Sequence, residues 1–195
     1  LICFLPMASA AALQEIQLTV GEVQRRYLVS VPTTSPPPEG WPLLLMVHGG
    51  GGNPESASTL MQMHEIGERE GFITAYVADV QDGWTVGEGA DTFGLSELPY
   101  FDAVLEDLQR RHPIDRRRQF IAGHSNGGEM AQIVLTNRPH TYAGIAIVNS
   151  PVLQWTTEVP VPDTPYVMFF RGTADPLVPM EAGEVGSTGR IGISA

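Results

Sequence analysis

The chain has 195 residues, of which 43% are hydrophobic and 17% charged, so it is long enough to bury one compact core and has too few charges for a disordered tail. Its formal net charge of −11 argues against nucleic-acid and anionic-membrane partners, because both surfaces would repel an acidic protein. The only cysteine, Cys3, lies near the N-terminus, which excludes disulfides, cysteine-based zinc sites and a cysteine nucleophile from the rest of the chain.

The first twelve residues, LICFLPMASAAA, begin with an apolar run and end in small residues around Ala8 and Ala10. This order is typical of the second half of a secretory signal peptide. An apolar N-terminal strand is the alternative. The pattern predicts a partial signal peptide over residues 1–12, a single catalytic domain over residues 13–195, and a secreted, extracellular protein.

Two segments of alternating polarity come next, at residues 16–20 and 25–32, with Gly21 and Glu22 between them. They predict a β-hairpin or the first strands of a sheet. The proline-rich stretch TTSPPPEGWP follows and predicts a loop, since prolines cannot pair in a central strand.

From Leu43 onward, unbroken apolar runs alternate with segments that have helical periodicity. Unbroken apolar strands are buried on both faces, and their alternation with helices indicates right-handed crossovers within a parallel sheet. The fold class predicted is therefore α/β, with a mostly parallel, doubly wound sheet. The expected strands are at residues 43–47, 72–78, 119–123, 143–148 and 166–170, and the expected helices at 56–70, 98–112 and 126–137.

Polar and glycine-rich loops follow each of these apolar runs. In a doubly wound sheet, ligands bind at the carboxyl ends of the strands. The loops HGGGGN, DVQDGW, GHSNGG, NSP and RGTADPLVP are therefore expected to meet at one edge of the sheet.

The loop GHSNGG contains Gly123, Ser125 and Gly127 in G-x-S-x-G spacing, between an expected strand and an expected helix. A nucleophile elbow needs small residues on either side of the serine because the turn is so sharp. Gly128 would let the helix pack closely on the strand. Ser125 is therefore predicted to be a nucleophile at a helix N-terminus; a glycine-rich turn without catalysis is the alternative.

The loop HGGGGN begins at His48 and follows the expected strand at residues 43–47. A tetrahedral intermediate needs N–H donors aimed at its oxygen, and a glycine run lets bare backbone approach the substrate. Gly50 and Gly51 are the predicted donors on this side, with the amide of Asn126 on the other. A phosphate-binding loop is the alternative, although the Lys-Ser/Thr of a P-loop is missing.

Two further candidates lie in loops at the same edge. Asp175 follows the expected strand at residues 166–170, about fifty residues after the serine, which fits the Ser…Asp…His order of a catalytic triad; a turn or helix-capping aspartate is the alternative. Trp84 is a candidate for lining an acyl or sugar pocket, against ordinary packing under a loop.

None of the five histidines is a convincing base. His124 adjoins Ser125 on a tight turn from which neighbouring side chains diverge, and His48 is better suited to shaping the glycine loop. His64 and His112 fall in expected helices, and His140 lies in the loop after the nucleophile helix, which leads away from the active edge.

Taken together, HGGGGNPE, YVADVQDGW, RRRQFIAGHSNGGEMA and RGTADPLVP resemble the secreted polyhydroxybutyrate depolymerase and feruloyl esterase-like group of the α/β-hydrolases, over most of the chain from about Gln14. The resemblance implies the α/β-hydrolase fold, with Ser125 as nucleophile, Asp175 as triad acid and the backbone at Gly50 and Asn126 as oxyanion hole. It also implies a triad histidine well after the aspartate.

This chain departs from that family pattern in two ways. Arg171 stands where the family usually has histidine, and no histidine follows Asp175. The expectation is therefore that the chain is truncated at its C-terminus and lacks a last strand, a last helix and the triad histidine.

The function expected is that of a secreted serine carboxylic ester hydrolase acting through an acyl-enzyme, with no metal or organic cofactor. The resemblance implies two groups of substrates: hydroxyalkanoate polyesters or oligomers, and feruloyl or acetyl esters of polysaccharides. The expected partner is therefore an ester substrate, either a small molecule or a polymer. Two alternatives remain: a serine peptidase of the prolyl oligopeptidase type, and a non-catalytic hydrolase fold that binds a polymer.

Overall fold

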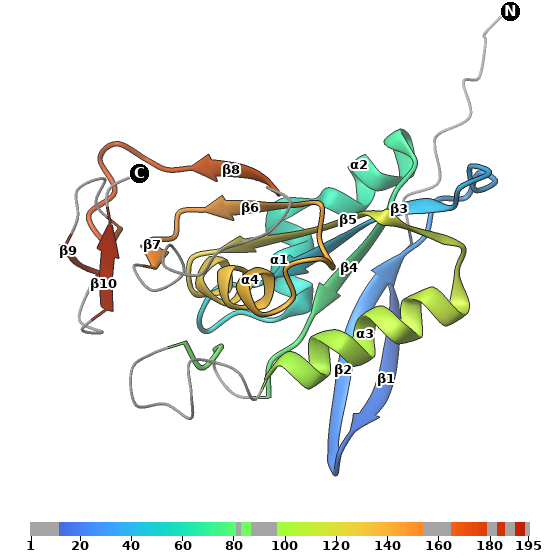
Figure 1. Cartoon of the computed structure of the whole chain (residues 1–195), viewed down its shortest axis with the longest axis horizontal. Coiled ribbons are helices and arrows are strands. Elements are labelled where there is room, and N and C mark those ends of the chain that lie inside the picture. The colour runs from blue at the N-terminus through green and yellow to red at the C-terminus, as the bar shows by residue number, and fades with distance from the viewer. Residues whose placement is uncertain are drawn as a thin grey trace, which may run out of the picture.

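The computed structural model describes residues 12–80, 83–86, 97–153, 165–178, 183–185 and 190–193 (Figure 1). A seven-stranded sheet runs through it, with antiparallel pairing at the β1 end and parallel pairing from β4 to β8. The predicted α/β class with a mostly parallel sheet is thereby confirmed. The spatial order is β1 (Gln14–Val20), β2 (Val23–Ser30), β4 (Ile73–Val77), β3 (Trp41–Val47), β5 (Ile114–His124), β6 (Gly144–Val148) and β8 (Tyr166–Phe170).

The predicted hairpin is also confirmed. Strands β1 and β2 pair antiparallel up to Val20 opposite Val23, and Gly21 in the turn has a φ of 59°. This is the left-handed region that glycine enters without steric cost. Residues 1–11 of the predicted signal peptide lie outside the described residues, so that prediction stays untested.

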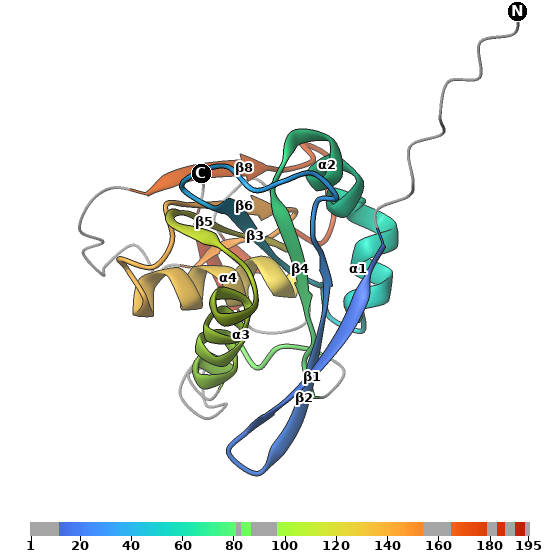
Figure 2. The same cartoon turned by 90° about the vertical axis from the view of Figure 1, so that its right-hand side faces the viewer.

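Helices cover both faces of the sheet, as Figure 2 shows: α1 (Pro54–Met61) and α2 (Met63–Glu70) lie on one side, and α3 (Leu98–Arg111) and α4 (Asn126–Asn137) on the other. Side chains of a strand alternate between the two faces. On β3, Leu43 and Leu45 belong to the main core beneath α3 and α4, whereas Met46 belongs to a smaller core beneath α1. The doubly wound arrangement follows from this alternation.

The helix predicted over residues 56–70 is two helices, so that prediction was wrong in this respect. Gln62 has φ 49° and ψ 25°, a left-handed conformation that ends α1, and α2 starts at the next residue. Its N–H still donates to the carbonyl of Ser58 at 3.0 Å. The break turns both Met61 and Met63 toward the sheet, where they pack beside the smaller core.

Two other strand features were not predicted. Strand β5 begins at Ile114, five residues before the expected start, because the charges of IDRRR hide it; buried Asp115 accepts from Arg118 Nε at 2.9 Å. A separate antiparallel sheet joins β7 (Val152–Leu153), β10 (Arg190–Ile193) and β9 (Gly183–Val185) beyond the ends of β6 and β8 (Figure 1).

Buried polar contacts fix β2 and α3 beside the end of β4. Arg25 pairs with Glu97 at 2.7 Å and donates to the carbonyl of Ala78 at 2.9 Å, while its guanidinium lies 3.7 Å from the centre of the Tyr100 ring. The Tyr100 hydroxyl accepts from the Ala78 amide at 2.9 Å. Paired buried charges of this kind hold the loop after β4 at the carboxyl edge of the sheet.

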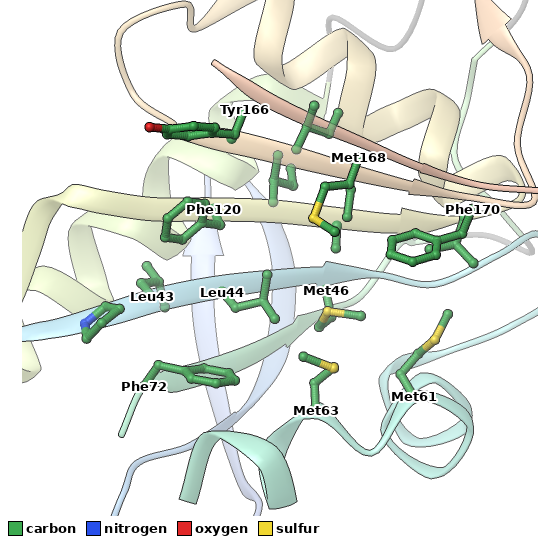
Figure 3. Close-up of a pocket in the computed structure, with 17 residues that line it drawn as sticks. Leu43, Leu44, Met46, Met61, Met63, Phe72, Phe120, Tyr166, Met168 and Phe170 are labelled. Carbon is green, nitrogen blue, oxygen red and sulfur yellow. The ribbon is translucent and has the colours of Figure 1, made fainter. Parts of the chain in front are cut away.

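Strand β8 exposes all five of its apolar side chains, from Tyr166 at 80% to Phe169 at 42%. Tyr166, Met168 and Phe170 point into an apolar cavity of about 520 Å³ that also lies against β3, β5, α1 and α2 (Figure 3). This cavity is on the sheet face and none of the predicted site residues lines it. No helix in the described ranges combines the length and the apolar character needed to cross a membrane.

Candidate active site

Ser125 lies at the sharp turn between β5 and α4. Its φ of 53° and ψ of −125° form a backbone conformation that a residue with a side chain rarely adopts. The turn is held by the Ser125 amide, which donates to the Val148 carbonyl at 2.9 Å, and by the Ser125 carbonyl, which accepts from Gly128 at 2.8 Å. Strain of this kind persists where the surroundings fix it, and it is what a nucleophile elbow requires.

Glycines around Ser125 let three backbone segments meet. A Cβ on Gly123 would lie 2.1 Å from the carbonyl oxygen of Gly127, and one on Gly127 would lie 2.3 Å from the carbonyl oxygen of His48. A Cβ on Gly128 would lie 2.5 Å from that of Ser150. The predicted steric need for these glycines is confirmed.

The glycine loop after β3 lies directly against this elbow. A Cβ on Gly49 would lie 3.1 Å from His124 Nδ1, and a Cβ on Gly50 would lie 3.6 Å from Asn126 Cβ. Gly51 has a φ of 69°, and Gly52 donates to the Gly49 carbonyl at 3.0 Å, which closes a tight turn. The structure thus places Gly49 beside Ser125 and the predicted oxyanion residue Gly50 beside Asn126, with Gly51 next along the loop.

The same loop is anchored where α1 begins. Asn53 caps the helix: its side-chain oxygen accepts from the Ser56 amide at 2.8 Å, and its own amide donates to Ser56 Oγ at 2.9 Å. Such a capping box satisfies two helix donors that would otherwise lack partners. The last residue of the glycine loop is therefore fixed in place.

His48 is buried at 3% exposure, and its ring holds the loop from inside. Its Nδ1 lies 2.9 Å from the Gly49 carbonyl oxygen, and its Nε2 lies 3.4 Å from both the amide and a carboxylate oxygen of Asp79. These contacts fit the shaping role expected for His48 and leave the ring engaged away from Ser125.

Trp84 lies beneath the glycine loop. The side chain is 3% exposed, its ring centre is 5.5 Å from that of Phe101, and its indole N–H donates to the His48 carbonyl at 2.8 Å. A side chain so enclosed cannot line an open pocket. The burial of Trp84 therefore favours ordinary packing under the loop over the predicted substrate-binding role. Its indole N–H is already paired with the carbonyl of His48.

Asp175 follows β8, and β6 separates β8 from β5 in the sheet. One carboxylate oxygen accepts from the amides of Leu177 at 2.9 Å and Val178 at 3.0 Å. These two backbone N–H groups, aided by the charge of Arg171, hold the pKa of Asp175 below its ordinary value. The carboxylate is therefore ionised at the carboxyl edge, and it also stabilises its own turn, as the alternative assignment expected.

The histidines differ in their surroundings. His124 is half-buried, and burial lowers its pKa while the charge of Asp175 opposes that shift. His64 Nδ1 lies 3.0 Å from the Tyr76 hydroxyl, within the α2 side of the sheet. These distances engage His48 with Gly49 and Asp79, and His64 with Tyr76, rather than with the Ser125 side chain.

No group of three or more histidine, cysteine, aspartate or glutamate side chains in the described ranges is placed to hold a metal ion. The geometry offers a serine in a strained backbone conformation, a glycine loop packed against it and an aspartate on the loop after β8, two strands away. The Asn126 side chain, which hydrogen-bonds to the backbone of Trp84, and Gly83, which has a φ of 146°, also belong to this site. The sequence analysis predicted neither feature, and the only sequence signal for them is the DGW turn at the active edge.

The mostly parallel sheet with helices on both faces is the fold of solved esterase structures. The prolyl oligopeptidase family model matches residues 89–176, which include Ser125 and Asp175. NocK of Nocardia uniformis subsp. tsuyamanensis, an inferred esterase, is 27% identical over 183 residues, covering 90% of this chain and 52% of NocK.

Two solved structures share the fold. A thermostable esterase has a TM-score of 0.70 at 18% identity, covering 86% of this chain and 48% of that chain. A ferulic acid esterase has a TM-score of 0.56 at 15% identity, covering 72% of this chain and 59% of that chain. The chain thus spans about half the length of NocK and of the thermostable esterase.

Proposed function

We propose that the chain is the nucleophile-bearing part of a serine carboxylic ester hydrolase. The observation that carries the proposal is Ser125, held at a φ of 53° between β5 and α4 with the glycine loop against it. The fold shared with the two esterase structures and the similarity to NocK support it.

The reaction proceeds through an acyl-enzyme. Ser125 Oγ attacks the ester carbonyl carbon, and the new oxyanion accepts hydrogen bonds from the amides of Asn126 and of Gly50 or Gly51. The alcohol leaves with the proton that the base took from Oγ, and water then releases the acid. Asp175 orients the base and stabilises its cation.

The base is a histidine that we place in a further segment of the whole protein. The order Ser125…Asp175…His is that of α/β-hydrolases, and the chain covers 52% of NocK. An aryl acetate assay of this chain and of a form extended by the downstream gene sequence tests this. The extended form is expected to be far faster, and equal rates would contradict the placement of the base.

The nucleophile itself is tested by covalent labelling. A fluorophosphonate is expected to label the extended protein at Ser125, and Ser125→Ala is expected to abolish both labelling and ester hydrolysis. Labelling that persists in the variant would overturn the assignment. Substrate binding without labelling would favour the non-catalytic polymer-binding alternative.

For substrates we propose hydroxyalkanoate oligomers and polyesters, or feruloyl and acetyl esters of polysaccharides. The ferulic acid esterase among the structural neighbours supports the second group. A panel of hydroxybutyrate oligomers, methyl ferulate and acetylated xylan separates them by kcat/KM. Activity on none of the three would contradict this proposal.

A serine peptidase is the second candidate, since the prolyl oligopeptidase model matches residues 89–176. Peptidases and esterases of this fold share the elbow and the triad order, so the fold does not separate them. Dipeptide amides beside the ester panel decide the matter, and a preference for amides would overturn the esterase proposal.

Secretion remains a proposal that rests on the apolar run and small residues of LICFLPMASAAA. Expression in a secreting bacterial host, with sequencing of the mature N-terminus, tests it. Cleavage near Ala10 is expected, and retention of the uncut segment in the cytoplasm would contradict it.

A further inference from the structure

The side chain of Asn126 brackets the backbone of Trp84. Its oxygen accepts from the Trp84 amide at 2.7 Å, and its Nδ2 donates to the Trp84 carbonyl at 3.1 Å. Nδ2 also lies 3.4 Å from a carboxylate oxygen of Glu129, one turn further along α4. An amide side chain that satisfies both main-chain groups of one residue fixes that residue in position and orientation.

Trp84 carries this connection on to the glycine loop. Its indole N–H donates to the carbonyl of His48 at 2.8 Å, and its ring packs 5.0 Å from the His48 ring, centre to centre. The indole is enclosed at 3% exposure, so it has little room to move. A continuous path therefore runs from the residue after the nucleophile to the first residue of the glycine loop.

Gly83 lets this path pass close to the site. Its φ is 146°, and a Cβ there would lie 3.2 Å from Asn126 Oδ1 and 3.4 Å from Gly50 Cα. The backbone before Trp84 thus runs between the Asn126 side chain and the glycine loop. Only a residue without a side chain fits this passage without strain.

We propose that this Asn126–Trp84 bridge sets the distance between the two halves of the oxyanion hole. The inference rests on the proposed esterase function for the meaning of that hole. The backbone amide of Asn126 forms one half and those of Gly50 and Gly51 the other. Asn126, through its side chain, and Trp84, through its indole, are then positioning residues: they touch no substrate but hold the donors where the oxyanion forms.

The bridge is tested first without any assay of activity, by NMR of the chain. Asn126→Ala keeps the backbone amide and removes both contacts to Trp84. We expect the Trp84 indole N–H to exchange with solvent at least about tenfold faster, and the amide resonances of Gly50 and Gly51 to shift. Asn137→Ala, the same change at the other end of α4, is the matched control and should do neither. Unchanged Gly50 and Gly51 resonances in Asn126→Ala would overturn the inference.

Kinetics of the extended form with an aryl acetate then test the consequence for catalysis. Asn126→Ala and Trp84→Phe should each lower kcat about tenfold with KM within about twofold, because a misplaced donor weakens binding of the transition state rather than of the substrate. The double variant should be no slower than the slower single variant, since both changes break one path. Trp41→Phe, the same change at another buried tryptophan, should leave kcat unchanged.

The outcomes separate this inference from the proposed function. A rise in KM alone, or additive losses in the double variant, would overturn the positioning role even with an active enzyme. An extended form that hydrolyses no ester would refute the proposed function, and the Gly50 and Gly51 resonances would then decide the bridge alone.

Discussion

Gly127 lies where the start of α4 packs against the end of β3. A Cβ there would lie 2.3 Å from the carbonyl oxygens of both Val47 and His48, and backbone atoms cannot turn aside. Gly127→Ala should therefore lower the free energy of unfolding by about 3 kcal/mol. Gly172→Ala is the control, since its Cβ would make an ordinary 3.7 Å contact and should change stability by less than about 0.5 kcal/mol. Equal urea midpoints for the two variants would contradict this account of the elbow.

His124 makes stability depend on pH at the same turn. Burial lowers its pKa in the folded state, so as pH falls below the ordinary value of about 6.5 the unfolded chain takes up the proton first. Stability should therefore fall between pH 7.5 and pH 5.5, and His124→Gln should lose less over that range. Burial also lowers the pKa of His112, so part of the dependence should remain. Urea unfolding at the two pH values checks this, and an identical loss in the variant would show that His124 does not contribute.

At this scale the sequence was informative about backbone and weak about side chains. Spacing alone placed Ser125 and its flanking glycines, because a sharp turn admits few residue types. Spacing could not show the contacts of Asn126 or the burial of Trp84, because both depend on how two loops distant in the chain pack. Trp84 was accordingly assigned to a pocket although its indole lies under the glycine loop.

The break between α1 and α2 gives a prediction at the scale of elements. Gln62 is exposed and holds a left-handed conformation, which costs a residue with a Cβ about 1 kcal/mol more than glycine. Gln62→Gly should raise the free energy of unfolding by about 0.5 kcal/mol. Glycine removes the backbone strain of the folded state, but the flexibility that it adds to the unfolded chain offsets part of that gain. Gln62→Ala, which keeps the strain, should bring no gain. A thermal melt of the three proteins checks the order, and a gain with alanine equal to that with glycine would contradict it.

The predictable elements share a physical trait. The parallel strands β3, β4, β6 and β8 are short and apolar, and such runs stand out in a sequence. The start of β5 did not stand out, because its sequence is charged and Asp115 neutralises the neighbouring arginines only within the folded strand. The helix break at Gln62 did not stand out either, because the apolar periodicity continues across it. Strands β7, β9 and β10 are two to four residues long and carry no pattern of their own.

The uncovered face of β8 concerns the molecule as a whole. Strands of a parallel sheet are normally buried on both faces, yet β8 exposes Met168 at 57% and Phe170 at 49% beside an apolar cavity of about 520 Å³. An exposed apolar surface of this kind binds the dye ANS and promotes association. We expect the chain to enhance ANS fluorescence and to self-associate in light scattering.

Substitutions on β8 locate that surface. Met168→Lys and Phe170→Lys should each reduce the ANS signal, whereas Leu177→Lys, at a loop residue that is 68% exposed and outside the cavity, should not. We propose that a longer form of the protein covers this face with further chain; it should then bind the dye several-fold less and remain monomeric. If that form bound ANS as strongly as this chain, the face would be open in the whole protein, which would contradict the expectation that a further segment covers it.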